Sequence, residues 1–283
     1  MNSGNITARL LRQFPQGAFS QLIGRASELR VPSLLLRPVI ASFAKVYDVD
    51  VHEAEIPAQG FESFDDFFTR RLRSDARPLA SGETIMAAPS DGKVIDVGPI
   101  SGGGELFIKG QQYTFEELLG GEQDKRLQGG SFAVLYLSPR DYHRVHCPLD
   151  ARVCRWWRIT GTRHPVNALG MRFVPKLFAS NERVVVHLYS EHVGDFYLVM
   201  VAAAGVGNIE LSFDPECRNG EASRKQYSET DWPHLEKGEE LGVFHLGSTV
   251  VLLTTKESNI IASVASGEML RMGQALGHKA SDE

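Results

Sequence analysis

Cysteine is scarce in this sequence, and the cysteines present predict neither a disulfide framework nor a metal centre. The 283 residues include three, Cys147, Cys154 and Cys217, which cannot all pair and whose spacing matches no set of metal ligands. Such usage is typical of a reducing compartment. The sequence also lacks an apolar run long enough to cross a bilayer, and its N-terminus lacks the apolar core and cleavage site of a signal peptide. We therefore expect a protein on the cytoplasmic side of a membrane.

An excess of positive charge is absent from the chain as a whole but present at its N-terminus. The net charge of −5 gives no reason to expect nucleic acid as a partner. Residues 1–45 are close to +5 and the remainder close to −10, because that segment carries one acid, Glu28, against Arg9, Arg12, Arg25, Arg30, Arg37 and Lys45. Basic residues mixed with Leu, Ile and Phe fit an amphipathic segment in a bilayer interface, and fit equally well helices that pack on the protein body.

Apolar periodicity predicts helices throughout this N-terminal segment. Short helices are expected over Ile6–Phe14 and Phe19–Leu29. Ser33 is a candidate N-cap for a third helix through Leu34–Val46, which should break or kink near Pro38.

The stretch Phe61–Arg73 predicts a better-formed helix. Ser63 is a plausible N-cap with Asp66 three residues further on, and the aromatic residues share one face. Three arginines are expected in the last turn, where positive charge complements the helix dipole: Arg70, Arg71 and Arg73. A core helix with a solvated basic edge explains this pattern.

Beyond residue 84 the pattern changes to short β-strands at regular spacing. The turn residues Pro-Ser-Asp-Gly precede an alternating strand to Val97, and further strands are expected at Ser131–Leu137, Arg152–Ile159, Arg183–Tyr189, Phe196–Ala203, Gly207–Leu211, Thr249–Thr255 and Asn259–Ile261. The polar stretch Asp214–Glu236 is expected to be a long surface connection, with a polar tail after Gly277. Helices followed by strands predict an α+β protein, with N-terminal amphipathic helices (1–60) and a β-rich domain with a sandwich-like core (61–283).

The stretch Glu240–Leu253 joins a short extended run to a β-branched run through Gly247-Ser248. Gly247 frees the backbone, and its carbonyl is the least hindered acyl group that a neighbouring hydroxyl could attack. Ser248 is therefore a candidate nucleophile, toward its own peptide bond as much as toward a substrate. A plain turn explains the same two residues.

Other polar residues in the β-rich part could carry chemistry. Asp91, before a glycine, forms a turn by default. His143 and His146 are three apart near a strand end; no third ligand is nearby, so one structural histidine and one general base fit better than a zinc site. An Asp, a His and Ser248 have the chain order of an orienter, base and nucleophile, but the Gly-x-Ser-x-Gly elbow of an ordinary hydrolase is absent. His164 and His245 are expected to be surface or packing residues.

Five blocks of this sequence resemble the signature blocks of bacterial phosphatidylserine decarboxylases of the prokaryotic type I kind. In chain order they are Phe61–Pro78, Pro89–Gly92, Leu137–Pro148, Leu177–Arg183 and Phe244–Thr249. Together they span most of the chain from about residue 60 to 255, and the Tyr-His-Arg-Val-His and Gly-Ser-Thr blocks in combination are highly specific. The first 45 residues and the polar stretch after residue 213 match more loosely.

The resemblance implies a proenzyme that cuts itself between Gly247 and Ser248. His146, held by Asp91, would take the proton of the Ser248 hydroxyl, whose Oγ attacks the Gly247 carbonyl to give an ester. Loss of the Ser248 α-proton would then expel the Gly247 carboxylate and leave dehydroalanine, which hydrolyses to a pyruvoyl group and ammonia. The products would be a β chain (1–247) and an α chain (248–283).

The resemblance also implies how such an enzyme would act. The pyruvoyl carbonyl would form a Schiff base with the amine of phosphatidylserine and accept the electron pair released with carbon dioxide, giving phosphatidylethanolamine without a metal. His143 would protonate the α-carbon. The implied partners are an anionic membrane containing phosphatidylserine, bound peripherally from the cytoplasmic face of the cell membrane by the segment 1–60, and the two chains as a heterodimer that dimerises further.

Two other functions remain open on the residues alone. A non-catalytic, lipid-binding or carrier-like β module would keep the chain intact. A serine hydrolase would use an uncut Ser248.

Overall fold

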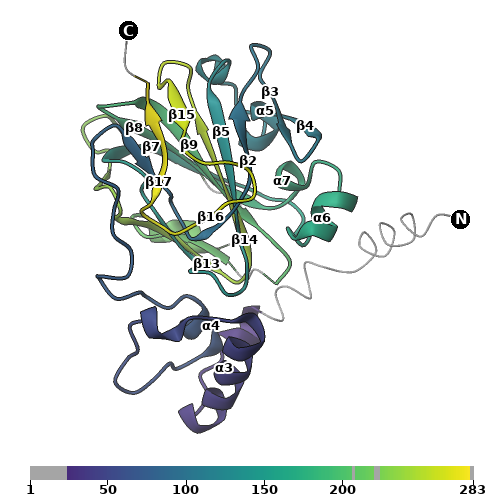
Figure 1. Cartoon of the computed structure of the whole chain (residues 1–283), viewed down its shortest axis with the longest axis vertical. Helices are drawn as coiled ribbons and strands as arrows, with labels where there is room; N and C mark the ends of the chain where they lie inside the picture. The colour runs from purple at the N-terminus through teal and green to yellow at the C-terminus, as the bar shows by residue number, and fades with distance from the viewer. Residues whose placement is uncertain (1–23, 206–207, 220–223, 281–283) are drawn as a thin grey trace, which may run out of the picture.

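The computed structural model describes residues 24–205, 208–219 and 224–280, and it divides them into a small helical part and a large β-rich body (Figure 1). The predicted helix Ile6–Phe14 lies outside the described residues, as does most of Phe19–Leu29, of which residues 24–27 are helical. Of the helices within the described ranges, none is both long enough and apolar enough to cross a bilayer.

Helix α3 (Ser33–Tyr47) packs against the segment that follows it in the chain through one aromatic side chain, Phe43. The ring of Phe43 lies 5.0 Å from that of Phe64 and 6.1 Å from that of Phe67. The predicted break does not occur: the helix continues through Pro38, which removes only one backbone hydrogen bond, and the packing of Phe43 holds the turns beyond it. The predicted cap is also wrong, because Pro32 occupies the N-cap position and no side chain caps the helix.

Helix α4 (Phe64–Phe68) is much shorter than predicted. Ser63 caps it as expected, since its Oγ accepts the N–H of Asp66 at 3.0 Å. The helix ends after one turn because the Thr69 hydroxyl donates to the Asp65 carbonyl at 2.8 Å. The arginines predicted for its last turn therefore lie beyond the helix, and Arg70 turns into the interior.

A nine-stranded antiparallel sheet forms the centre of the body. Its spatial order is β11 (Arg224–Gln226), β7 (Ala151–Ile159), β8 (Arg183–Ser190), β9 (Gly194–Ala202), β14 (Ser248–Thr254), β5 (Ser131–Leu137), β2 (Gly92–Pro99) and β16 (Met269–Leu270), with β12 (His234–Leu235) on β7. Strand β14 pairs along its whole length with β9 and β5, so that Ser248 lies opposite Ala202 and Leu137. Every residue of β14 is buried, as its uninterrupted apolar run predicts.

Smaller elements surround this sheet. One three-stranded sheet holds β1 (Ile85–Ala87), β17 (Ala275–Lys279) and β15 (Ile260–Ala262); a second holds β10 (Asn208–Leu211), β13 (Glu240–His245) and β6 (Arg144–His146); β3 (Glu105–Ile108) and β4 (Gln111–Thr114) form a hairpin. The short helices of the body are α5 (Phe115–Leu119), α6 (Ala168–Phe173) and α7 (Leu177–Ser180), and the 3₁₀ turns are η1 (Val51–Glu53), η2 (Lys125–Leu127) and η3 (Pro215–Asn219).

Two sequence predictions for the C-terminal half are wrong. The stretch Asp214–Glu236 is not simply a surface connection: it contributes β11 and β12, and buried Asp214 accepts hydrogen bonds from the Trp156 indole at 2.9 Å and the Tyr227 hydroxyl at 2.6 Å. The polar composition of this stretch predicted exposure, because the sequence does not show which buried partners its polar side chains bind. The expected tail after Gly277 continues as β17 to Lys279.

The predicted class is nevertheless confirmed. The seven strands given bounds from the sequence agree with observed strands to within two residues at each end, and the strand expected to reach Val97 ends at Pro99. The chain is an α+β protein with a β-rich core, and Ser248 is the buried first residue of β14, which lies between β9 and β5 in the large sheet.

Candidate active site

The Gly247–Ser248 peptide bond lies where the chain passes from one sheet to another. Strand β13 belongs to the small sheet with β10 and β6, whereas β14 lies in the large sheet, so the two do not form the hairpin that a plain turn would give. Between them, Leu246 (φ 77°) and Gly247 (φ 44°) both adopt left-handed backbone conformations. That conformation is costly for leucine. Backbone strain therefore lies directly beside this peptide bond.

The hydroxyl of Ser248 is buried without a partner. The residue is fully buried, and its Oγ has no hydrogen bond to any described residue; the same holds for Oγ1 of the following Thr249. A buried hydroxyl without a partner loses its hydration and gains nothing in return, which costs about 1–3 kcal/mol. Such an uncompensated group in the middle of a core is typical of a reactive position.

His143 supplies a buried, neutral imidazole. Its Nδ1–H donates to the Asp141 carbonyl at 2.8 Å, which leaves the lone pair on Nε2, and Nε2 has no partner among the described residues. Complete burial, with a smaller contribution from the nearby charge of Arg70, lowers the pKa of His143 to about 3. The ring of Phe68 lies 4.1 Å away and fixes one face. Nε2 of His143 is therefore a nitrogen with a lone pair that no described residue occupies.

His146 is also neutral, but both its nitrogens are engaged. Nδ1–H donates to the Gly238 carbonyl at 2.8 Å, and Nε2 accepts the hydroxyl of Tyr142 at 3.0 Å. Burial lowers the pKa of His146. Burial likewise raises the pKa of Tyr142, so the phenol keeps its proton and remains the donor in this pair.

Asp91 does not contact His146 in this structure. Its carboxylate is held by the Arg77 guanidinium at 2.9 and 2.6 Å and by the backbone N–H of Met272 at 2.8 Å. The turn that carries Asp91 does lie against His146, because the Pro89 carbonyl accepts the backbone N–H of His146 at 2.7 Å. The structure thus brings the predicted residues into one neighbourhood, but among the described residues no hydrogen bond links Ser248 to a histidine or His146 to Asp91.

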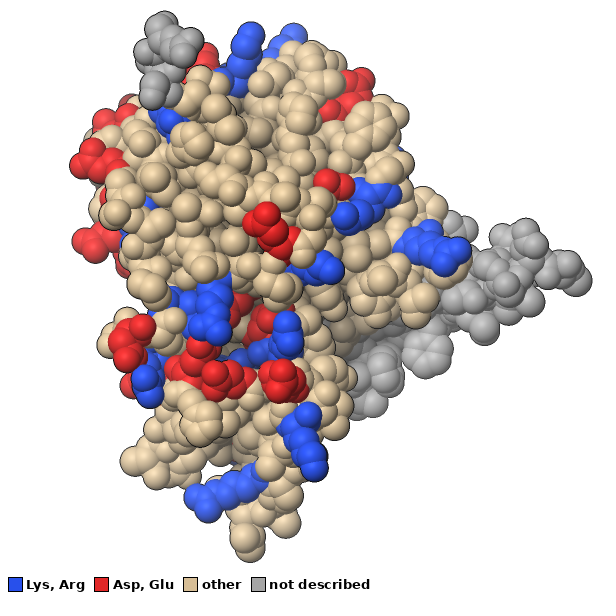
Figure 2. All heavy atoms as spheres, in the orientation of Figure 1, with Lys and Arg blue, Asp and Glu red and all other residues tan. Residues whose placement is uncertain are grey.

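A cavity of about 430 Å³ lies beside Asp91. Asp91 and Tyr142 line it together with Arg70 and Arg77, and its rim includes Asp48 at the end of α3. Figure 2 shows acidic and basic side chains gathered in the band where the helical part meets the β-rich body. The cavity is therefore polar and charged, and it is lined by Asp91 of the predicted site and by Tyr142, which hydrogen-bonds His146.

Comparison with known proteins decides the family. A family model described as phosphatidylserine decarboxylase matches residues 64–278. The chain is 38% identical over 274 residues to a phosphatidylserine decarboxylase proenzyme of Brevibacillus brevis, covering 95% of this chain and 96% of that protein. Proenzymes of the same description from Anaeromyxobacter sp. (strain K) and Myxococcus xanthus are 37% and 36% identical, covering 94% and 95% of this chain and 96% of each relative. The chain belongs to the phosphatidylserine decarboxylase family.

Within this member of the decarboxylase family, sequence reasoning missed the setting of His245. This histidine is not a surface residue: its Nδ1 lies 2.7 Å from Asp65 Oδ2 and its Nε2 lies 3.2 Å from Glu210 Oε1. Burial alone lowers its pKa, but the two carboxylates outweigh burial and raise the pKa to about 9. The sequence contains no signal that pairs His245 with Asp65 or Glu210, because they are far apart in the chain. Its position three residues before Ser248 is the feature that could have marked His245 as a candidate.

The other residues left without a role are structural. His164 is buried, and its backbone N–H and carbonyl both bond the side chain of Asn181, at 3.0 and 2.8 Å, so its assignment as a packing residue fits. Cys147 is buried in the core, where burial raises the pKa of its thiol to about 12 and keeps it unreactive.

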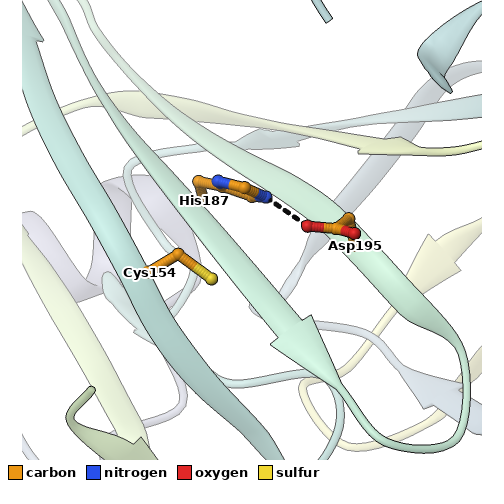
Figure 3. Close-up of side chains that lie close together, drawn as sticks. All are labelled: Cys154, His187 and Asp195. Atoms are coloured by element: carbon orange, nitrogen blue, oxygen red, sulfur yellow. Dashed lines mark hydrogen bonds and ion pairs between the residues drawn. The ribbon is translucent and has the colours of Figure 1, made fainter. Parts of the chain in front are cut away.

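A second cluster of polar side chains lies across three neighbouring strands of the large sheet. Ligand-type atoms of Cys154, His187 and Asp195 lie within 4.8 Å of one another (Figure 3). His187 Nε2 bonds Asp195 Oδ1 at 2.6 Å, and the same carboxylate pairs with Arg126. Burial raises the pKa of the Cys154 thiol to about 12. The cation already beside Asp195 opposes a metal ion there, so the cluster is best explained as a hydrogen-bonded network.

Proposed function

We propose that this chain is the proenzyme of a pyruvoyl-dependent phosphatidylserine decarboxylase, which releases carbon dioxide and phosphatidylethanolamine. The observation that carries the proposal is the Ser248 hydroxyl, which is fully buried and unpaired at the first residue of the central strand. It directly follows the left-handed residues Leu246 and Gly247. The relatives named above are phosphatidylserine decarboxylase proenzymes, which supports the same activity for this chain.

Self-cleavage would use Ser248, His146 and Asp91. Oγ of Ser248 attacks the Gly247 carbonyl, and Nε2 of His146 takes the hydroxyl proton. In the uncut chain Nε2 accepts the Tyr142 hydroxyl, so this hydrogen bond must open first. Asp91 acts on His146 through its charge in this arrangement, since its oxygens are held by Arg77 and Met272; that charge favours the protonated imidazole against the effect of burial.

The two products, 1–247 and 248–283, would stay together. After cleavage, β14 of the shorter chain still lies between β5 and β9 of the longer chain, with seven residues paired on each side. Strands β15 and β17 of the shorter chain pair with each other, and β17 also pairs with β1 of the longer chain. We therefore expect a tight heterodimer, with the new amino terminus held in the core.

The buried position of Ser248 fits a pyruvoyl group, because conversion removes an unpaired hydroxyl from the core. When present, the group supplies a carbonyl that condenses with the substrate's amine and takes up the electron pair released with carbon dioxide. His143 is the proposed donor of the proton that the α-carbon takes up as carbon dioxide leaves. Its Nδ1–H is held by Asp141, so Nε2 would carry that proton, which comes from solution because the overall reaction consumes one, and the low pKa of His143 favours its transfer to the substrate.

Helix α3 suits a protein that works at an anionic lipid surface. It exposes large apolar side chains to solvent, namely Leu34, Leu35, Val39 and Val46. Arg37 and Lys45 lie on the same helix. Apolar burial and attraction to anionic lipid would both hold this helix in a bilayer interface, at the cytoplasmic face of the cell membrane.

The test is the intact mass of the purified protein under denaturing conditions, beside a Ser248→Ala variant. Two fragments that divide at 247/248, the smaller without a free amino group, are expected from the wild type, and one uncut chain from the variant. A wild type that remains a single chain would refute the pyruvoyl enzyme and favour a non-catalytic lipid-binding module.

A further inference from the structure

Arg70 is a buried cation that rests on the ring of Phe67, 5.4 Å from its centroid, and that has no ion-pair partner among the described residues. The residue is 5% exposed and lines the cavity beside Asp91. One of its nitrogens donates to the Arg140 carbonyl at 3.0 Å, while Nε and the other terminal nitrogen have no hydrogen-bond partner among the described residues. A guanidinium carries five donors, and leaving them unpaired in the interior is expensive. Among the described residues the carboxylates of Asp91, Asp141 and Glu53 act on this charge only through space, and none of them hydrogen-bonds it, so an anion in the cavity would be attracted to it.

The other arginines of this cavity already have acidic partners. Arg77 pairs with Asp91 at 2.6 Å and with Glu53 at 2.8 Å. Arg271 pairs with Glu53 at 2.6 Å, and Arg140 lies 3.7 Å from Asp141. Among the described cavity residues, Arg70 is the arginine that no carboxylate holds within ion-pair distance.

Arg70 lies between helix α3, which is proposed to contact lipid, and the histidines that are proposed to react. Two residues before it, the ring of Phe68 packs against His143, and the Arg70 charge adds to the effect of burial in lowering the pKa of that histidine. Tyr142, next to His143, lines the same cavity. The cavity rim includes Asp48, where the apolar helix α3 ends. A lipid anchored on α3 would therefore present its headgroup to this cavity.

We infer that Arg70 binds the phosphodiester of the substrate's headgroup in this cavity, an assignment that rests on the proposed function. A guanidinium matches the paired oxygens of a phosphodiester. The carboxylate of the same headgroup is the poorer match: its charge must move onto the carbon skeleton in the transition state, so a cation held on it would stabilise the ground state and slow the reaction. The phosphodiester keeps its charge throughout.

Binding to the uncut Ser248→Ala protein tests this without any decarboxylation. The probes are glycerophosphoethanolamine, which has a phosphodiester and no carboxylate, and L-serine, which has a carboxylate and no phosphate, each titrated calorimetrically. We expect glycerophosphoethanolamine to bind, and adding Arg70→Gln to weaken it at least about 10-fold. Arg73→Gln is the matched control, because Arg73 is exposed and pairs with Asp75, and it should leave the affinity unchanged.

The cleaved enzyme gives the second readout. Because the phosphodiester contact is the same in ground and transition states, Arg70→Gln should raise KM at least about 10-fold and change kcat less than about 2-fold. Arg70→Lys keeps the charge but not the paired donors, so its KM should lie between those of wild type and Arg70→Gln. If Arg70→Gln fails to fold, the KM of Arg70→Lys is the deciding measurement.

The outcomes separate this inference from the proposed function. Glycerophosphoethanolamine binding that does not depend on Arg70 overturns the inference, as does Arg70-dependent binding of L-serine alone, or a loss of kcat at constant KM. Arg70-dependent phosphodiester binding, together with a wild-type chain that is never cleaved, supports the anion site and refutes the decarboxylase instead.

Discussion

His245 and Asp65 form a buried ion pair that joins the helical part of the molecule to the segment proposed to be cut. The two side chains meet at 2.7 Å, and Glu210 holds the other ring nitrogen of His245 at 3.2 Å. Asp65 belongs to α4, Glu210 to β10, and His245 ends β13 just before Leu246. One imidazolium therefore fixes three elements at the point where the backbone enters its left-handed turn.

The pKa of His245 predicts how stability depends on pH. Its pKa is raised from 6.5 to about 9 in the folded chain, so its contribution is fully present below pH 6.5 and is lost as the pH rises through 9. A shift of this size is worth at most roughly 3 kcal/mol. In the uncut Ser248→Ala protein, adding His245→Gln should cost much of this in urea unfolding at about pH 6 and little at about pH 10. A cost that does not change with pH would contradict the assignment.

Arg77 should matter more for stability than any exposed arginine near it. Its side chain is 6% exposed and holds both Asp91 and Glu53. Removing one member of a buried pair leaves an uncompensated charge, so Arg77→Gln in the uncut protein should cost about 3 kcal/mol in urea unfolding. Arg73→Gln breaks only an exposed pair with Asp75 and should cost less than about 1 kcal/mol. If Arg77→Gln and Arg73→Gln lower the free energy of unfolding equally, the buried pair of Arg77 with Asp91 contributes no more to stability than the exposed pair of Arg73.

The strands and the candidate residues could be predicted because each leaves a local signal. The apolar run of β14 gives its burial, and the motifs around Asp91, His143, His146 and Ser248 mark them as candidates wherever they lie in space. Gly92 is a further case: its backbone (φ 157°) approaches the Tyr136 carbonyl so closely that a Cβ would lie 2.7 Å from that oxygen, which explains the glycine of Pro-Ser-Asp-Gly.

The partners of these residues could not be predicted, because pairing depends on the tertiary fold. Asp91 binds Arg77 and the backbone of Met272, a residue far along the chain, so the expected contact with His146 is absent. The length of α4 was overestimated because the Thr69 hydroxyl ends a helix that the apolar pattern would extend. Arg70, assigned from the sequence to a helix terminus, became a cavity residue for the same reason.

The two histidines should fail at different stages. His146→Ala should leave the chain uncut, since the proposed base for Ser248 is lost. His143→Ala should still yield the two fragments, but the cleaved protein should decarboxylate at least about 100-fold more slowly, because proton transfer to the α-carbon of the substrate is lost. Intact mass and release of carbon dioxide from phosphatidylserine measure the two stages separately. An uncut His143→Ala beside a cleaved His146→Ala would reverse the roles.

Helix α3 should govern attachment to anionic lipid. Leu34 and Leu35 are 81% and 64% exposed, and burying two such side chains in an interface is worth about 3 kcal/mol or more. Leu34→Glu with Leu35→Glu removes that gain and adds charges repelled by the lipid, so binding to phosphatidylserine-containing vesicles should fall at least about 10-fold in a sedimentation assay. Self-cleavage should be unaffected, because neither residue contacts the core.

A matched control separates a specific surface from general hydrophobic adhesion. Leu169 is 57% exposed on α6, which Figure 1 places on the β-rich body away from α3. Leu169→Glu removes a comparable apolar side chain and should leave vesicle binding within about 2-fold of wild type. If the α3 double variant binds vesicles as well as this control does, the helix is not the membrane contact, and the route by which a lipid headgroup reaches Arg70 must begin elsewhere on the rim of the cavity.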